Sequence, residues 1–185
     1  MKTAAPHQHA LLPTNAGGAQ PGKYLTFTLG EESYGIPVLK VREIIRLCPI
    51  TPVANMPEHI KGVINLRGKV IPLVDLRAKF RLPVAVDNDR TCIVVTQIAA
   101  PAGGMRLYGV IVDAVEEVAT FTAADIEPTP DFGGAVDAHF ITGMAKAGPA
   151  VKVLIDLDKI SAVDGTIAIQ ALASSHSSQP KEAAP

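Results

Sequence analysis

Short apolar runs alternate with turn-forming residues along most of this chain. The runs are rich in Val and Ile and are separated by Gly, Pro, Asn and Asp, which is typical of β-strands. Many short strands at such spacing favour small β-barrels. The expected strands are Tyr24–Leu29, Ser33–Ile36, Glu43–Leu47, Gly62–Leu66, Lys69–Leu73, Thr91–Ile98, Tyr108–Val112, Glu116–Thr120, Thr142–Lys146 and Val151–Ile155.

The two ends of the chain lack this pattern. Residues 1–22 and 174–185 combine Ala, Pro, Gly, Ser and polar residues without periodicity, which predicts two disordered tails. Helical periodicity is present only near the C-terminus, where apolar residues between 160 and 172 fall on one face. We therefore expect a single C-terminal helix over residues 156–173.

An internal repeat is the most informative feature of the sequence. Tyr34-Gly-Ile-Pro-Val38, followed by Val41 and Glu43, recurs 74 positions later as Tyr108-Gly-Val-Ile-Val112, followed by Val115 and Glu117. In the same order, Ile60-Lys-Gly62 and Leu73-Val-Asp-Leu76 recur 81 positions later as Ile141-Thr-Gly143 and Leu154-Ile-Asp-Leu157.

The repeat predicts two related barrels. An insertion within residues 127–138 would account for the change in offset, because surface loops accept added length at little entropic cost. We expect a first barrel over about residues 23–90, completed by a returning C-terminal segment, and a second over about residues 91–155.

Composition excludes several classes of partner and location. The 17 Lys and Arg against 18 Asp and Glu give a net charge of -1, so no general field attracts nucleic acid or anionic lipid. No apolar run approaches the roughly 18 residues of a membrane helix, and polar residues interrupt any secretion signal. Cys48 and Cys92 stand apart, which indicates free thiols in a reducing compartment. We expect a soluble cytoplasmic protein.

The sequence offers no convincing catalytic or metal site. His59 and His139 precede the repeated turn and are interpreted as surface histidines, and no nucleophile is paired with a base. The glycines of segment 62–69 have the wrong spacing for a phosphate loop. Residues 87–89 begin like a calcium loop but lack its glycine and glutamate. We expect no enzyme activity, no metal and no cofactor.

One difference between the repeats points to recognition. The first repeat has Asn65-Leu-Arg67-Gly68-Lys69 where the second has Lys146-Ala-Gly-Pro-Ala150. Gly68 suits a tight hairpin turn, which would display Arg67 at its tip. Two interpretations stay open from the residues alone: a guanidinium that binds a partner, or an ordinary solvated turn arginine.

Several segments of the chain, over about Lys23–Ile160, resemble a known family, the CheW domain. The segment INLRGKVIPLVDLR, residues 64–77, is the most specific part of the resemblance. The other strings are YLTFTLGEESYGIPVLKVREIIR, ITPVANMPEHIKGV, YGVIVDAVEEV and VKVLIDLDKI. The departures are modest: Ala54 replaces a frequent proline, Cys92 stands at a usual Val or Ile position, and both tails are additional.

The resemblance implies a mainly β fold of two intertwined five-stranded SH3-like β-barrels with a C-terminal helix. It also implies a non-catalytic adaptor that joins the cytoplasmic tip of methyl-accepting chemotaxis receptors to the histidine kinase CheA. Such an adaptor would be a monomer when free and would be recruited to the inner face of the membrane through receptor arrays. Its activity would be binding, without ATP, metal or other cofactor.

The resemblance also implies two partner-binding faces, whose residues are taken from the matching positions of this sequence. The family's receptor face corresponds to Val41, Glu43, Gly62, Arg67, Thr91 and Cys92, with Arg67 expected near Glu43. The kinase face corresponds to Glu32 and Val38, which could equally be ordinary barrel surface or core. Phe132, in the inserted loop, either contacts a neighbouring kinase domain or folds back over its own barrel.

Other functions remain to be weighed against this one. The same domain could serve a non-flagellar pathway with pili or another output, since the barrels would be common to all of them. It could also be a detached regulatory module of a kinase, although the 185 residues contain no recognisable ATP-binding or phospho-acceptor region. An enzyme of unrecognised type is the third alternative and lacks a candidate site.

Overall fold

The computed structural model describes residues 18–100, 103–130 and 139–161, and these are almost entirely β-structure. Every strand predicted from the apolar runs is present, with bounds that differ by a few residues. The strands are β1 (Gly22–Leu29), β2 (Glu32–Pro37), β3 (Val41–Arg46), β4 (Ile60–Leu66), β5 (Lys69–Asp75), β6 (Cys92–Ala99), β7 (Met105–Val112), β8 (Ala114–Phe121), β9 (Ile126–Glu127), β10 (Ile141–Ala147) and β11 (Ala150–Ile155).

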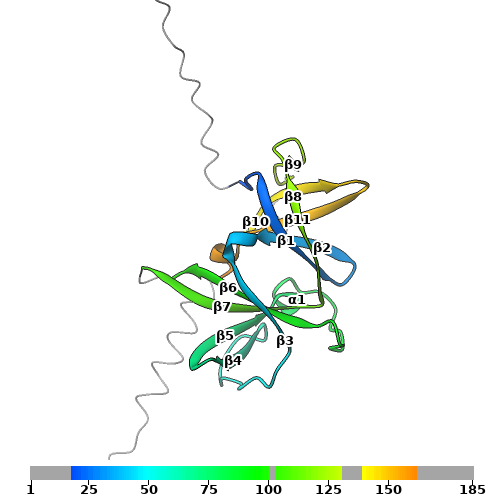
Figure 1. Cartoon of the computed structure of the whole chain (residues 1–185). Coiled ribbons are helices and arrows are strands. Elements are labelled where there is room, and N and C mark those ends of the chain that lie inside the picture. The colour runs from blue at the N-terminus through cyan, green and yellow to red at the C-terminus, as the bar shows by residue number, and fades with distance from the viewer. Residues whose placement is uncertain (1–17, 101–102, 131–138, 162–185) are drawn as a thin grey trace, which may run out of the picture.

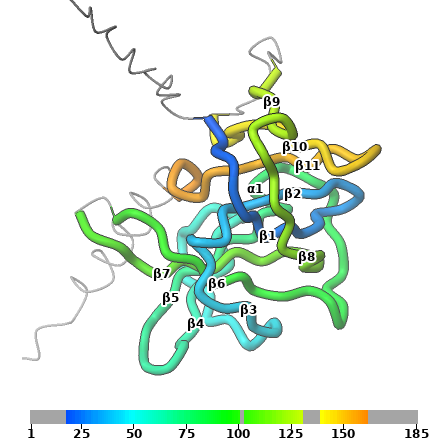
Figure 2. Tube along the Cα trace, turned by 45° about the horizontal axis from the view of Figure 1, so that its top comes forward, coloured from blue at the N-terminus to red at the C-terminus, as the bar shows by residue number. Residues whose placement is uncertain are grey.

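The strands form two sheets, one in each barrel. Sheet I has the order β8-β1-β2-β11-β10-β9 and sheet II the order β3-β6-β7-β5-β4; we call the corresponding barrels I and II. In Figure 2 the blue β1 and β2 lie with the yellow and orange β10 and β11, so both ends of the described chain contribute to barrel I. The expected mainly β fold of two intertwined barrels is confirmed.

The sheets do not follow the expected division of the chain near residue 90. Sheet I takes β1 and β2 from the first repeat and β8 to β11 from the second, whereas sheet II takes β3 to β5 from the first and β6 and β7 from the second. Two parallel pairings, β2 with β11 and β5 with β7, join strands that are distant in sequence. The first hairpin of each repeat, β1–β2 or β6–β7, thus belongs to a barrel whose other strands come from the other repeat.

The strand register confirms that the two halves correspond residue by residue. Leu73 lies opposite Gly109 in sheet II, and its counterpart Leu154 lies opposite Gly35 in sheet I. A Cβ atom on Gly109 would stand 2.3 Å from Leu73 Cδ2, and one on Gly35 would stand 2.9 Å from Leu154 Cδ2. Glycine is required at both places because the parallel strand's leucine fills the space.

Three short elements were not predicted from the sequence. The two-residue β9 pairs with β10 and makes sheet I six-stranded instead of five-stranded. A 3-10 turn, η1 (Val38–Lys40), links β2 to β3. The single-turn helix α1 (Leu76–Lys79) begins after Asp75, whose carboxylate accepts hydrogen bonds from the backbone N–H groups of Arg77 and Ala78. Elements this short leave no periodic signal in the sequence.

The predicted C-terminal helix begins one residue later than expected. Residues 157–161 are helical, and the remainder of the predicted span to 173 lies outside the described residues. Asp156 caps this helix by accepting a hydrogen bond from the backbone N–H of Asp158. Asp75 does the same for α1, which places the two helices at corresponding ends of β5 and β11.

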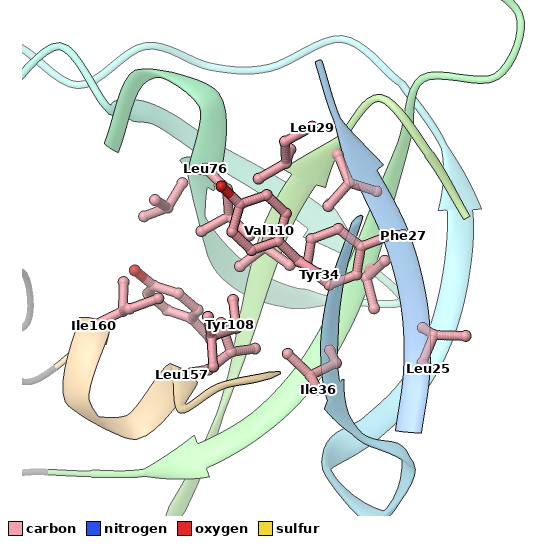
Figure 3. Close-up of a cluster of buried hydrophobic side chains, with 14 of the residues drawn as sticks. Leu25, Phe27, Leu29, Tyr34, Ile36, Leu76, Tyr108, Val110, Leu157 and Ile160 are labelled. Atoms are coloured by element: carbon pink, nitrogen blue, oxygen red, sulfur yellow. The ribbon is translucent and has the colours of Figure 1, made fainter. Parts of the chain in front are cut away.

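The largest apolar core lies between the barrels. Figure 3 shows Phe27, Tyr34 and Ile36 from barrel I facing Tyr108 and Val110 from barrel II, with Leu76, Leu157 and Ile160 closing the cluster. Phe27, Ile36 and Val110 are fully buried, and each contributes about 1.5–3 kcal/mol by leaving water. This shared core makes the two barrels one folding unit.

Each barrel also has its own interior, and the two interiors differ in chemistry. Barrel II contains Ile71, Val95 and Leu107. The counterparts in barrel I, by register and offset, are Lys152, Thr26 and Ser33. Lys152 Nζ lies 2.7 Å from Glu116 Oε2, and Ser33 donates to Glu116 Oε1 at 2.8 Å. A polar network therefore occupies barrel I where barrel II is aliphatic.

The network also governs the protonation of its carboxyl. Burial on its own raises the pKa of Glu116, but the hydrogen bonds from Lys152, Ser33 and Thr26 and the positive charge of Lys152 outweigh it. The pKa of Glu116 is therefore below its ordinary value. The ionised carboxylate is the form that this site stabilises.

Candidate partner-binding site

The hairpin turn between β4 and β5 displays Arg67 as the sequence predicts. Arg67 has φ 51° and Gly68 φ 82°, and two consecutive positive φ angles are typical of a type I′ turn. Asn65 Oδ1 accepts a hydrogen bond from the Gly68 backbone N–H at 2.9 Å, which fixes the turn. The Arg67 side chain is 78% exposed at its tip.

Arg67 reaches from this turn to the edge strand β3. Its Nη2 lies 2.8 Å from Glu43 Oε2 and its Nη1 3.3 Å from Glu43 Oε1, which is a two-pronged ion pair. The predicted proximity of Arg67 and Glu43 is therefore confirmed. Because Arg67 is mostly exposed, the pair contributes at most about 1 kcal/mol to folding. Its main physical effect is to fix the orientation of two opposite charges at the surface.

The counterpart of Arg67 in the other repeat shows what the turn itself requires. Gly148, with φ 62°, occupies the equivalent place in the β10–β11 turn. Glycine adopts this left-handed conformation without strain, whereas a residue with a Cβ pays about 1 kcal/mol or more. Arg67 thus adopts a backbone conformation that the second repeat gives to glycine.

The structure places the other expected receptor-face residues on barrel II but buries two of them. Val41 is partly buried at the start of β3, against the shared core. Gly62 is buried with φ +135°, and a Cβ there would stand 2.1 Å from the Thr51 carbonyl oxygen. Any side chain at residue 62 would displace the chain between β3 and β4. Gly62 therefore acts by allowing a close backbone approach.

Thr91 and Cys92 lie at the far end of β3, where Cys92 is opposite Arg46. Thr91 is 7% exposed, and its hydroxyl accepts a hydrogen bond from the backbone N–H of Asn88. Cys92 is partly exposed; burial raises the pKa of its thiol more than a hydrogen bond with the Val115 backbone lowers it. Thr91 thus holds the turn that precedes β6, and Cys92 is a neutral thiol beside it.

The expected kinase-face residues are not brought together. Glu32 begins β2 and Val38 follows its end, so a strand of six residues separates them, which spans roughly 20 Å. Glu32 accepts a hydrogen bond from the Tyr34 hydroxyl at 2.6 Å, and burial together with this contact raises the pKa of Tyr34. Phe132 lies outside the described residues.

A cavity of about 500 Å³ adjoins Val38. Its lining includes Tyr24, Pro37, Leu39 and Leu157, so β1, η1 and the helix at 157–161 all contribute. Leu39 is 89% exposed at the rim. Sequence reasoning missed Leu39 because one apolar residue between two strands has no periodic signature. An exposed leucine beside an apolar hollow is a feature of docking sites.

Comparison with known proteins decides the family. Residues 23–164 match the family model described as a CheW-like domain. The chain belongs to the CheW-like family. It is 36% identical over 161 residues to the chemotaxis protein CheW of Klebsiella aerogenes, covering 87% of this chain and 94% of that protein. It is 33% identical over 136 residues to CheW of Rhizobium meliloti, covering 74% and 84%.

A solved CheW structure agrees with the fold described above. The scaffolding protein TtCheW from Thermoanaerobacter tengcongensis aligns with a TM-score of 0.69 at 34% sequence identity, covering 79% of this chain and 96% of that one. Within the described part of this CheW-like chain, no helix has the length and apolar composition to cross a membrane. The same residues contain no group of three side chains placed to hold a metal ion.

Proposed function

We propose that this chain is a non-catalytic adaptor that couples the cytoplasmic tips of chemotaxis receptors to the kinase CheA. Membership of the CheW-like family supports this role, since the related proteins are named chemotaxis and scaffolding proteins. Two barrels with different surfaces give one molecule separate places for two partners. The observation that carries the proposal is Arg67, displayed on a strained turn and held by Glu43.

The receptor contact is centred on Arg67 and Glu43 in this proposal. Val41 and Cys92 add partly exposed apolar surface near the two ends of β3. Gly62 and Thr91 take part indirectly, because their burial lets them shape the surface without touching a partner. An amphipathic receptor helix would pack on the apolar surface and meet the charged pair at the rim.

The kinase contact is assigned to the cavity beside Val38. The apolar lining and the exposed Leu39 suit an apolar side chain of the partner. Glu32, at the other end of β2, is too distant to belong to the same small contact. Because the cavity belongs to barrel I and Arg67 to barrel II, receptor and kinase could be bound at the same time.

Replacing Arg67 with glycine tests this proposal with little disturbance to the fold. Arg67→Gly gives the turn the residue found at Gly148, so relief of backbone strain offsets the lost ion pair and stability changes by less than about 1 kcal/mol. Kinase activity is measured in a reconstituted mixture of receptor membranes, CheA and the full chain. Receptor control of the kinase should be lost while binding to CheA alone is retained.

A charge exchange separates recognition from internal orientation. Glu43→Arg combined with Arg67→Glu restores an ion pair with the two charges exchanged. If a partner binds the guanidinium at residue 67, receptor control of the kinase should still be absent in this variant. Full signalling by the exchanged variant would mean that the pair matters only within the molecule. Wild-type protein that remains folded yet never brings receptor and CheA into one complex would refute the adaptor role itself.

A further inference from the structure

The outward face of β3 carries two positive charges, those of Arg42 and Arg46. The alternating burial of this strand leaves Arg42, Ile44 and Arg46 exposed and turns Val41, Glu43 and Ile45 inward. Ile44 is 45% exposed and lies between the two arginines on this face. Among the described residues, neither Arg42 nor Arg46 has an ion pair or side-chain hydrogen bond. The fold therefore makes no use of either guanidinium.

A third guanidinium lies beside this strand. Arg67 is bound to Glu43, which lies between Arg42 and Ile44 along β3. Because neighbouring residues on a strand point to opposite faces, Arg67 and Glu43 lie on the inward side of β3, and only Arg42 and Arg46 share the outward face with Ile44. β3 is an edge strand of sheet II, so within the described part of the chain it pairs with β6 on one side only.

The other repeat is an internal control for this charge pattern. β8 is the counterpart of β3 and is likewise an edge strand, at one side of sheet I. Its residues Glu116, Val118 and Thr120 correspond to Arg42, Ile44 and Arg46. Val118 is 51% exposed, so the exposed apolar residue is present in both strands, while the positive charges are present only on β3. Folding a strand at this position does not require arginines.

We propose that the outward face of β3 binds an acidic segment of the receptor, with Arg42 and Arg46 contacting carboxylates on either side of an apolar residue that packs on Ile44. This inference rests on the adaptor function proposed above and adds the chemistry of the partner. Charge complementarity selects the occupant, since the guanidiniums of Arg42 and Arg46 attract an acidic helix and repel a basic one.

The spacing favours a helical occupant. Arg42 and Arg46 are four residues apart on β3, which is roughly 13 Å along an extended strand. Acidic residues two turns apart on a helix are about 11 Å apart, and the flexible arginine side chains span the difference. An apolar residue one turn from each of them would face Ile44. The receptor segment is therefore expected to carry a repeated acidic, apolar, acidic pattern along one helical face.

Charge reversal on β3 tests the inference directly. Arg42→Glu with Arg46→Glu in the full chain should weaken co-sedimentation with receptor membranes about tenfold, and Arg42→Gln with Arg46→Gln should weaken it less. Thr120→Glu on β8 is the matched control, because it adds the same charge at the position corresponding to Arg46. It should leave receptor binding unchanged. Binding of purified CheA and the melting temperature should be the same in all variants.

Salt dependence provides a second readout. Receptor binding of the wild-type chain should weaken as salt rises, and the Arg42→Gln, Arg46→Gln variant should lose part of that dependence. Equal receptor binding by wild type and both double variants would overturn the inference while leaving the adaptor role intact. So would a change confined to self-association, measured by sedimentation velocity. Failure of the wild type to bind receptor membranes at all would overturn both.

Discussion

Both barrels are bridged by an ion pair, yet the two pairs are placed in opposite ways. In barrel I the cation is interior: the Lys152 side chain is 9% exposed and donates to Glu116 and Thr26, and Ser33 donates to the same Glu116 carboxylate. In barrel II the cation is at the surface: the Arg67 side chain is 78% exposed and is paired with Glu43. A charge removed from water must keep its partner for the fold to survive, whereas an exposed charge remains available to another molecule.

The largest expected effect follows from breaking the buried pair. Lys152→Ala removes a buried side chain together with the cation of Glu116 and should lower the free energy of unfolding by about 3 kcal/mol. Replacing both partners with apolar residues, as Lys152→Met with Glu116→Leu, should give a stability equal to or above wild type, because barrel II folds with Ile71 at this place. Urea unfolding at neutral pH measures both. A loss below about 1 kcal/mol for Lys152→Ala would show that the network is not structural.

A smaller effect is expected at two corresponding glycines, Gly62 in β4 and Gly143 in β10. Each lies where the strand pairing shifts register, at a β-bulge. Gly62→Ala places a Cβ 2.1 Å from the Thr51 carbonyl at φ +135°, and Gly143→Ala places one 2.9 Å from the Glu127 carbonyl. The first should cost about 2–3 kcal/mol and the second about 1 kcal/mol, since only the first combines a clash with backbone strain.

Thermal melts of the two glycine variants give the comparison. Receptor binding of Gly62→Ala, measured at a temperature where the variant is folded, then tells whether Gly62 acts only through the fold. Equal destabilisation by the two substitutions would contradict the expectation that Gly62→Ala costs more than Gly143→Ala.

The smallest effect is a dependence of stability on pH. The pKa of Glu116 in the folded chain is below the ordinary value of 4.5. Its ionised form therefore contributes stability that is fully present above about pH 4.5 and is lost as pH falls through the folded pKa. The loss should be smaller than for Lys152→Ala, because a protonated carboxyl still accepts hydrogen bonds.

The matched variant is Glu116→Gln, which cannot ionise. The difference in unfolding free energy between wild type and Glu116→Gln should shrink as pH is lowered from about 6 to about 3. Urea titrations at several pH values would measure it. A difference that stays constant over this range would mean that Glu116 does not titrate with folding.

The candidate site was predictable to the extent that it depends on local sequence. The Asn65 to Lys69 turn and its display of Arg67 follow from turn chemistry, and the contrast with Gly148 was present in the repeat. The burial of Gly62 and Thr91 was not predictable, because it depends on the chain before β4 and the turn before β6 packing over them. The cavity beside Val38 was also missed, since its walls come from three distant segments.

The sequence by itself determined the strands, the duplication and the exposed turn arginine, because apolar periodicity and turn residues act over a few neighbouring positions. Only the tertiary structure decided that the repeats exchange hairpins, since strand pairing is selected by which core it closes. It also decided that Lys152 is buried beside Glu116, while Arg42 and Arg46 have no ion pair with any residue that the structure describes. The environment of a charge is set by all the elements packed around it, and no single segment of sequence contains that information.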